Sequence, residues 1–134
     1  MKYEHNFYRT LDGTLDIEFL FVDTGPADGW RAYILTDINY KSVSEYRSGS
    51  CVDIHKLVEK NDTRLQKIRR FIQSTRDNYS QDEPVYYICW TETVDNLDKM
   101  RNIAKAWSEI TAYYIQHGGS FEKIQGILQS RGII

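Results

Sequence analysis

Hydrophobic and polar residues alternate in the first quarter of the chain. Every second position from Leu15 to Phe21 is apolar, which is the spacing of a strand with one buried face. The pair Asp12-Gly13 directly precedes this run, and it is favoured in two-residue type I′ turns because both positions need positive φ. The pattern therefore predicts a β-hairpin that turns at Asp12-Gly13.

The centre of the turn also sets the register of this hairpin. Counting outward from Asp12-Gly13 places Tyr8 opposite Ile17 and Arg9 opposite Asp16. An aromatic residue then faces a β-branched residue, and two opposite charges face each other, as cross-strand pairs prefer. The agreement between turn and pairing supports the predicted register.

Three further segments are candidates for strands. Residues 30–37, "WRAYILTD", carry apolar side chains on both faces, which favours a central position in a sheet. Residues 85–91, "VYYICWT", are rich in β-forming residues and too short for a typical helix. Residues 50–58 fit a short strand or a helix, and the strand is preferred.

Helical spacing marks the rest of the chain. Residues 63–77 have one apolar stripe, with Asp62 or Thr63 as the N-cap. A helix of about twenty residues, or roughly 30 Å, begins after Asp95 or Asn96 and ends at "HGG", where glycine can take the left-handed conformation. A short final helix follows Ser120. The apolar stripe of the long helix comprises Leu97, Met100, Ile103, Ala104, Trp107, Ile110, Thr111, Tyr114 and Ile115.

Together these elements predict one α+β domain over residues 1–134. Its antiparallel sheet has four to five strands: the N-terminal hairpin and the strands near 30–37 and 85–91, with 50–58 as a further candidate. The long C-terminal helix and the short final helix cover one face of the sheet, because strands come first and helices gather at the end. An additional helix lies near 63–77. No internal repeat and no long linker divides the chain.

Composition points to a globular, cytoplasmic protein. A chain of 134 residues is long enough to bury a core without a disulfide or a metal. The two cysteines fit a reducing compartment, and no apolar run approaches the roughly eighteen residues of a membrane span. The first ten residues lack the apolar stretch of a secretory signal.

Charge is uneven along the chain, although the net charge is only −2. Residues 1–30 are acidic, whereas the segment from Arg64 to Arg76 holds five Lys/Arg and no acid. Such a helix face can contact phosphates or an acidic partner, and a solvated surface is the more ordinary interpretation. The candidate partner-binding residues are Lys67, Arg69, Arg70 and Arg76 on this helix and Tyr40, Tyr46 and Tyr79 in predicted loops. Tyrosine is enriched where proteins meet partners.

Few residues are candidates for catalysis or for metal binding. Cys51, Asp53 and His55 lie close in sequence, and a histidine can activate a nearby thiol. Cys–His pairs usually meet through the fold, however, so a half-exposed strand is the preferred interpretation. Glu92, Asp95 and Asp98 are explained by the start of the long helix, where negative charge is favourable. We expect no metal and no cofactor, since no ligand spacing or phosphate loop is present.

The two tryptophans that flank the predicted strand–helix junction, Trp90 and Trp107, are interpreted as core residues. The sequence therefore predicts a small binding protein without catalytic activity. Its expected partner is a protein, self-association is possible, and one origin consistent with its size is a phage or mobile element whose product inhibits a host protein. Two alternatives stay open: nucleic-acid or nucleotide binding through the basic helix 64–76, and a cysteine-dependent enzyme using Cys51 and His55.

Overall fold

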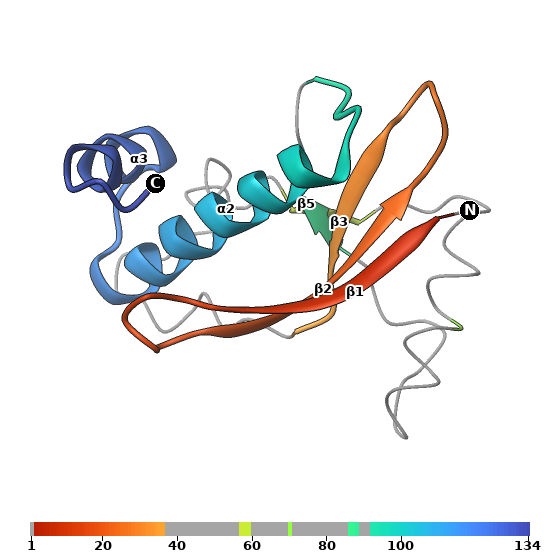
Figure 1. The fold of residues 1–134 in the computed structure, drawn as a ribbon. Helices are drawn as coiled ribbons and strands as arrows, with labels where there is room; N and C mark the ends of the chain where they lie inside the picture. Colours follow the sequence, from red (N-terminus) through yellow and green to blue (C-terminus); the bar gives the residue numbers. More distant parts are fainter. Residues whose placement is uncertain (1, 37–56, 60–69, 71–85, 89–91) are drawn as a thin grey trace.

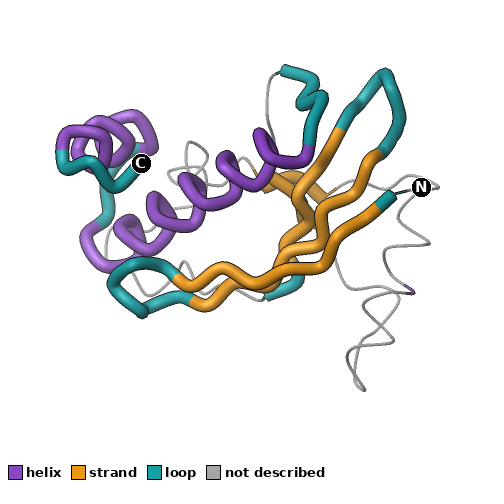
Figure 2. Tube along the Cα trace, viewed as in Figure 1, coloured by secondary structure: helices purple, strands orange, loops and turns teal. Residues whose placement is uncertain are grey.

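The computed structural model of the protein describes residues 2–36, 57–59, 70, 86–88 and 92–134. A twisted sheet forms one layer, and a long helix crosses one face of it (Figure 1). A second, short helix lies at the far end of the long one, near the C-terminus (Figure 2). This arrangement is the predicted α+β fold.

The sheet has five strands in the order β1-β2-β3-β5-β4, and every neighbouring pair is antiparallel. The strands are β1 (Tyr3–Arg9), β2 (Asp16–Asp23), β3 (Trp30–Ile34), β4 (Leu57–Glu59) and β5 (Tyr86–Ile88). The predicted strands near 30–37 and 85–91 are confirmed, and β3 is central as expected. β4 provides a strand at the end of segment 50–58, while residues 51–56 lie outside the described part of the chain.

The register of the hairpin is confirmed, but the predicted turn type is wrong. Tyr8 pairs with Ile17 and Arg9 pairs with Asp16. The connection is a four-residue loop closed by the Thr10 N–H, which donates to the Leu15 carbonyl at 2.9 Å. Gly13 has positive φ, and no other residue type does in the described ranges, so a type I′ turn cannot form at Asp12-Gly13. The predicted two-residue loop and the observed four-residue loop are both centred between Asp12 and Gly13. Both therefore place the same residues of the two strands opposite each other.

The side chain of Asp12 holds this loop together. It accepts hydrogen bonds from the Thr14 N–H at 3.0 Å, the Thr14 hydroxyl at 2.7 Å and the Thr10 hydroxyl at 2.8 Å. The side-chain amide of Gln116, on the long helix, donates to the same carboxylate at 2.5 Å. Burial alone would raise the pKa of Asp12, but these hydrogen bonds outweigh it and hold the pKa well below 3.8.

This lowered pKa predicts an acid-dependent loss of stability. Because the folded-state pKa lies below the unfolded one, the contribution of Asp12 is fully present above about pH 4 and is lost as pH falls toward the folded-state value. We expect Asp12→Asn to be less stable than the natural chain at neutral pH, with the difference shrinking steadily under acid. Urea unfolding of both proteins, followed by circular dichroism across the acid range, measures it. A difference that is constant with pH would contradict the assignment.

Both C-terminal helices begin and end where the sequence indicates. Helix α2 spans Leu97–His117, and the Asn96 side chain caps it by accepting from the Lys99 N–H at 2.7 Å. Gly118, with φ 72°, follows its last turn and donates its N–H to Tyr114. Helix α3 spans Phe121–Ser130 and is capped by Ser120. The two helices share a small apolar cluster, so α3 rests on the end of α2.

The main core lies between α2 and one face of the sheet. Trp107 is 3% exposed and meets the Phe19 ring edge-on, with centroids 6.3 Å apart. Ile88 of β5 belongs to the same buried cluster, although α2 packs mainly against β2 and β3. Trp107 is thus a core residue, whereas Trp90 lies outside the described residues. The cluster comprises Ile17, Phe19, Phe21, Ala32, Ile34, Ile88, Val94, Met100, Ala104 and Trp107.

The opposite face of the sheet is also buried at its centre. Leu20 and Val22 of β2, Tyr33 of β3 and Leu35, which directly follows β3, are each 3% exposed or less. Burial on both faces explains why the β3 segment carries apolar residues at consecutive positions. Neither described helix, α2 or α3, is long and apolar enough to cross a membrane.

Candidate functional site

Strand β1 is an edge strand among the strands that the structure describes. It pairs with β2 on one side and stands at the end of the strand order. Tyr3 is 62% exposed, Phe7 is 61% exposed and Leu11, at the hairpin loop, is 74% exposed. These are the large hydrophobic side chains that the described part of the chain leaves in solvent, and all three lie along one hairpin. This clustering makes the hairpin a candidate interaction surface.

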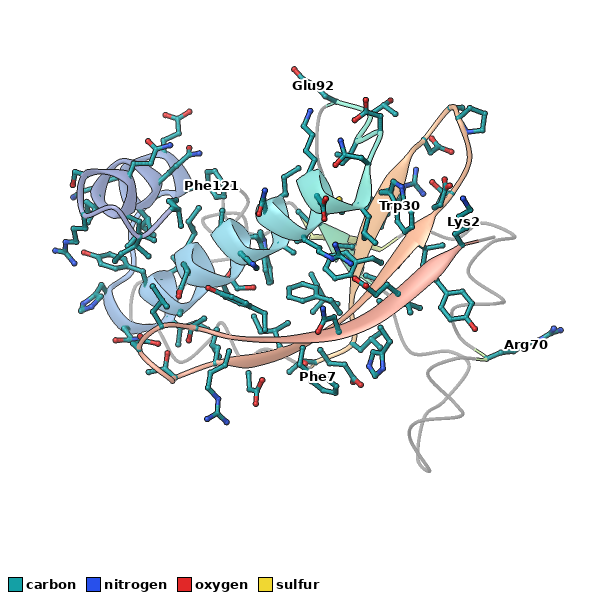
Figure 3. All side chains as sticks on the ribbon, viewed as in Figure 1. Lys2, Phe7, Trp30, Arg70, Glu92 and Phe121 are labelled. Atoms are coloured by element: carbon teal, nitrogen blue, oxygen red, sulfur yellow. The ribbon has the colours of Figure 1, made fainter. Side chains whose placement is uncertain are left out.

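The two faces of β1 differ in their surroundings. Glu4, Asn6 and Tyr8 point toward α2: Glu4 contacts that helix and Tyr8 packs on the core. The alternate residues point to the other face, where Phe7 and His5 have ring centroids 5.1 Å apart. Figure 3 shows Phe7 on the side of the hairpin away from α2.

Polar contacts between β1 and β2 also lie on this outer face. His5 Nε2 lies within hydrogen-bond distance of Glu18 Oε2, at 2.7 Å, and Arg9 forms an ion pair with Asp16 at 3.2 Å, as the sequence predicted. The second pair is well exposed, so it is worth little more than a few tenths of a kcal/mol. The aromatic rings, and not these charges, distinguish the face.

Alternate backbone groups of β1 point away from the sheet. The Lys2 carbonyl and the Thr10 N–H both bond to the β2 side of the hairpin. In an antiparallel pair, every second residue makes these bonds, so the N–H and C=O groups of Tyr3, His5, Phe7 and Arg9 face outward. The Phe7 N–H is satisfied by the Asn6 side chain, whose Oδ1 accepts it at 2.9 Å. The outward groups of Phe7 and Arg9, at the hairpin end of β1, are therefore a candidate pairing edge for an added strand.

Helix α2 runs alongside this edge and supplies positive charge. Arg101 donates to both carboxylate oxygens of Glu4 at 2.8 and 2.5 Å and to Asp98 at 2.6 Å. The hydrogen bond with Glu4 raises the pKa of Arg101 further, so the guanidinium is charged at all relevant pH values. Lys105, one turn later on α2, is exposed.

A small hollow lies between β1 and α2. Its volume is about 100 Å³, and Phe19, Phe21 and Ala104 provide its apolar surface. Arg101 and Lys105 border it on the helix, and Asn6, Phe7 and Tyr8 border it on the strand. A space of this size suits one aliphatic side chain and is far smaller than the 300–1,000 Å³ of ordinary small-molecule pockets.

A second, open hollow of about 330 Å³ lies between the hairpin loop, α2 and the C-terminal segment. The most buried charged residue that lines it is Glu109, whose carboxylate accepts a hydrogen bond from the Leu11 N–H at 2.6 Å. Burial and then Glu109 raise the pKa of Tyr8. Since Glu109 and Asp12 are engaged in fixing the loop to α2, these carboxylates are structural, and this hollow is a weaker candidate.

Of the partner-binding residues predicted from sequence, the structure describes Arg70 alone. Arg70 is in a helical conformation and exposed, and it points away from the sheet (Figure 3). The other six, and the Cys51–His55 pair, lie outside the described residues: Lys67, Arg69, Arg76, Tyr40, Tyr46 and Tyr79. That these residues form a partner-binding surface therefore stays a prediction. The part of the chain that it describes holds no group of three or more His, Cys, Asp or Glu that could bind a metal.

The sequence analysis missed Tyr3, Phe7 and Lys105 as site residues. One indication was present in the first strand, where aromatic residues fall on both faces. A hairpin usually needs apolar residues only on the face that packs against the core. The chain matches no protein-family model, no curated protein and no solved structure. Function must therefore be inferred from this geometry.

Proposed function

We propose that this protein is a non-enzymatic binding domain that captures an extended polypeptide at the β1 edge. The observation that carries the proposal is the coincidence, on one strand, of outward backbone groups and solvent-exposed aromatic side chains. Strand addition draws affinity from main-chain hydrogen bonds and specificity from alternate side chains, and β1 provides both. Inhibition of a host protein, the role expected from the sequence, would proceed through this contact.

The proposal predicts that one outward N–H matters more than the side chain beside it. Arg9→Pro removes an outward donor and leaves the β1–β2 hydrogen bonds intact, because the Arg9 N–H points away from β2. Arg9→Ala removes the guanidinium and keeps the donor. We expect strand-forming peptides to bind the natural protein and Arg9→Ala alike and to bind Arg9→Pro about tenfold more weakly, the value of one hydrogen bond.

The experiment pans a library of random seven-residue peptides displayed on phage against the natural protein. Enriched peptides are then measured by fluorescence anisotropy with all three proteins, after circular dichroism has verified that each variant is folded. Peptides that lose affinity for Arg9→Pro alone support strand capture. An absence of enrichment, or equal affinity for Arg9→Pro, would sink the proposal.

A further inference from the structure

We infer that the open hollow between the hairpin loop, α2 and the C-terminal segment binds a free aliphatic amino acid, with leucine as the model ligand. The ligand's ammonium group meets the carboxylates of Asp12 and Glu109, and its carboxylate meets Arg131. Its side chain lies on the apolar part of the lining. This site goes beyond the proposed strand capture, because none of these three residues lies on β1.

The size and lining of the hollow suit a small organic molecule. Its volume of about 330 Å³ falls at the lower end of the roughly 300–1,000 Å³ of ordinary small-molecule pockets. The apolar lining comes from three separate parts of the chain and comprises Leu11, Ala112, Leu128 and Ile133. Leu11 is 74% exposed, so a short aliphatic group placed against it removes apolar surface from water.

Two carboxylates make one side of the hollow negative. Glu109 is 6% exposed and is hydrogen-bonded to the Leu11 N–H and to the Tyr8 hydroxyl. Asp12 accepts from hydroxyl, N–H and amide groups, and its lowered pKa keeps it charged. All of these donors are neutral, so they fix the hairpin loop without neutralising either charge.

The negative charge is therefore available to a ligand. Neither Asp12 nor Glu109 forms an ion pair with a residue that the structure describes. A buried carboxylate is ordinarily paired with a cation, because burial removes the water that would otherwise solvate its charge. An ammonium group that enters the hollow supplies this missing cation.

Arg131 gives the hollow a positive charge on another side. It follows α3 at the C-terminal end of the chain, whereas Asp12 lies in the hairpin loop and Glu109 lies on α2. Arg131 is exposed and has no ion pair within the described ranges, so its guanidinium is too far from both carboxylates for direct contact. A zwitterion spans this gap, whereas a simple amine leaves Arg131 unpaired and a simple carboxylate leaves the acidic side unpaired.

Three probes that differ by one charged group test the ligand class. They are leucine, isoamylamine, which lacks the carboxylate of leucine, and isocaproate, which lacks its ammonium group. Since one hydrogen bond between charged groups is worth tenfold or more in affinity, we expect leucine to bind the natural protein at least about tenfold more tightly than either analogue. Isothermal titration calorimetry at low salt measures the three affinities. A failure of leucine to bind, or an analogue that binds as tightly, would overturn the inference.

A substitution at Arg131 tests the carboxylate contact. Arg131→Gln is expected to weaken leucine binding about tenfold and to leave isoamylamine binding unchanged, because only leucine has a group that reaches Arg131. Arg70→Gln, the same change at an exposed arginine that does not line the hollow, should alter neither affinity. Circular dichroism verifies that both variants are folded. An equal loss for both ligands would assign Arg131 a structural role and contradict the contact, as would an unchanged affinity for leucine.

Methyl signals locate the bound ligand. In carbon–proton correlation spectra of the labelled protein, unlabelled leucine is expected to shift the methyl signals of Leu11 and Ile133, which line the hollow. The signals of Ile17, in the main core, should stay in place. Shifts confined to methyl groups away from the hollow would place leucine at another site and refute the assignment. Neither result bears on strand capture, which the Arg9 variants test separately.

Discussion

Trp107→Ala is expected to lower the free energy of unfolding by about 3–5 kcal/mol, the range for deleting a buried aromatic side chain. Trp107 is 3% exposed and packs edge-on against Phe19, so its removal leaves a cavity between α2 and the sheet. Such a loss is a large part of the 5–15 kcal/mol that stabilises an ordinary domain. Urea unfolding followed by far-ultraviolet circular dichroism measures it without relying on tryptophan fluorescence.

An exposed position on the same helix provides the control. Asn102→Ala should change stability by less than about 0.5 kcal/mol, because the Asn102 side chain lies in solvent. If Trp107→Ala proved equally mild, Trp107 would not be a core residue, and the division between a buried strand–helix core and an exposed β1 edge would fail.

Gly29→Ala is expected to destabilise the protein by about 2–4 kcal/mol, since it combines backbone strain with a steric clash. Gly29 has φ +68°, a conformation that alanine adopts at a cost. A Cβ at this position would overlap the Val94 carbonyl oxygen and would lie 2.8 Å from a Thr93 methyl group. The clash would also disturb the neighbouring bond in which the Trp30 N–H donates to Val94 at 2.8 Å.

The same substitution elsewhere should have the opposite sign. Gly126 lies inside α3. A Cβ added there would have no atom within 4 Å, apart from its chain neighbours and the backbone of its own helix. Gly126→Ala is therefore expected to raise stability by about 0.5–1 kcal/mol through helix propensity. Urea unfolding of the two variants gives a direct comparison, and a destabilised Gly126→Ala would show that α3 has a close neighbour on that side.

Local rules explain the elements that sequence reasoning predicted well. Asn96 and Ser120 cap α2 and α3 because each places an acceptor three residues before an unpaired N–H. The hairpin register survived a wrong turn type, since a two-residue and a four-residue loop centred on Asp12-Gly13 pair the same residues. In both cases the interacting groups are close in the chain, so the local sequence pattern is enough to predict the contact.

The site could not be predicted in the same way. Tyr3 and Phe7 look like core residues in the sequence, and they are exposed because β1 ends up at the edge of the sheet. Glu109 reads as a solvent-facing charge on α2, yet it is 6% exposed because the hairpin loop covers it. The first outcome depends on the strand order, and the second depends on a contact between residues 98 positions apart in the chain.

The sequence by itself determined the class of fold, the register of the first hairpin and the ends of the C-terminal helices, because alternation, helical spacing and capping act within a few residues. Tertiary structure alone decided the strand order, which strand lies at the edge, and that Lys105 borders a hollow beside it. The physical reason is that exposure belongs to the assembled sheet: an aromatic side chain is buried or free according to whether another layer or strand covers it, and no local pattern records that.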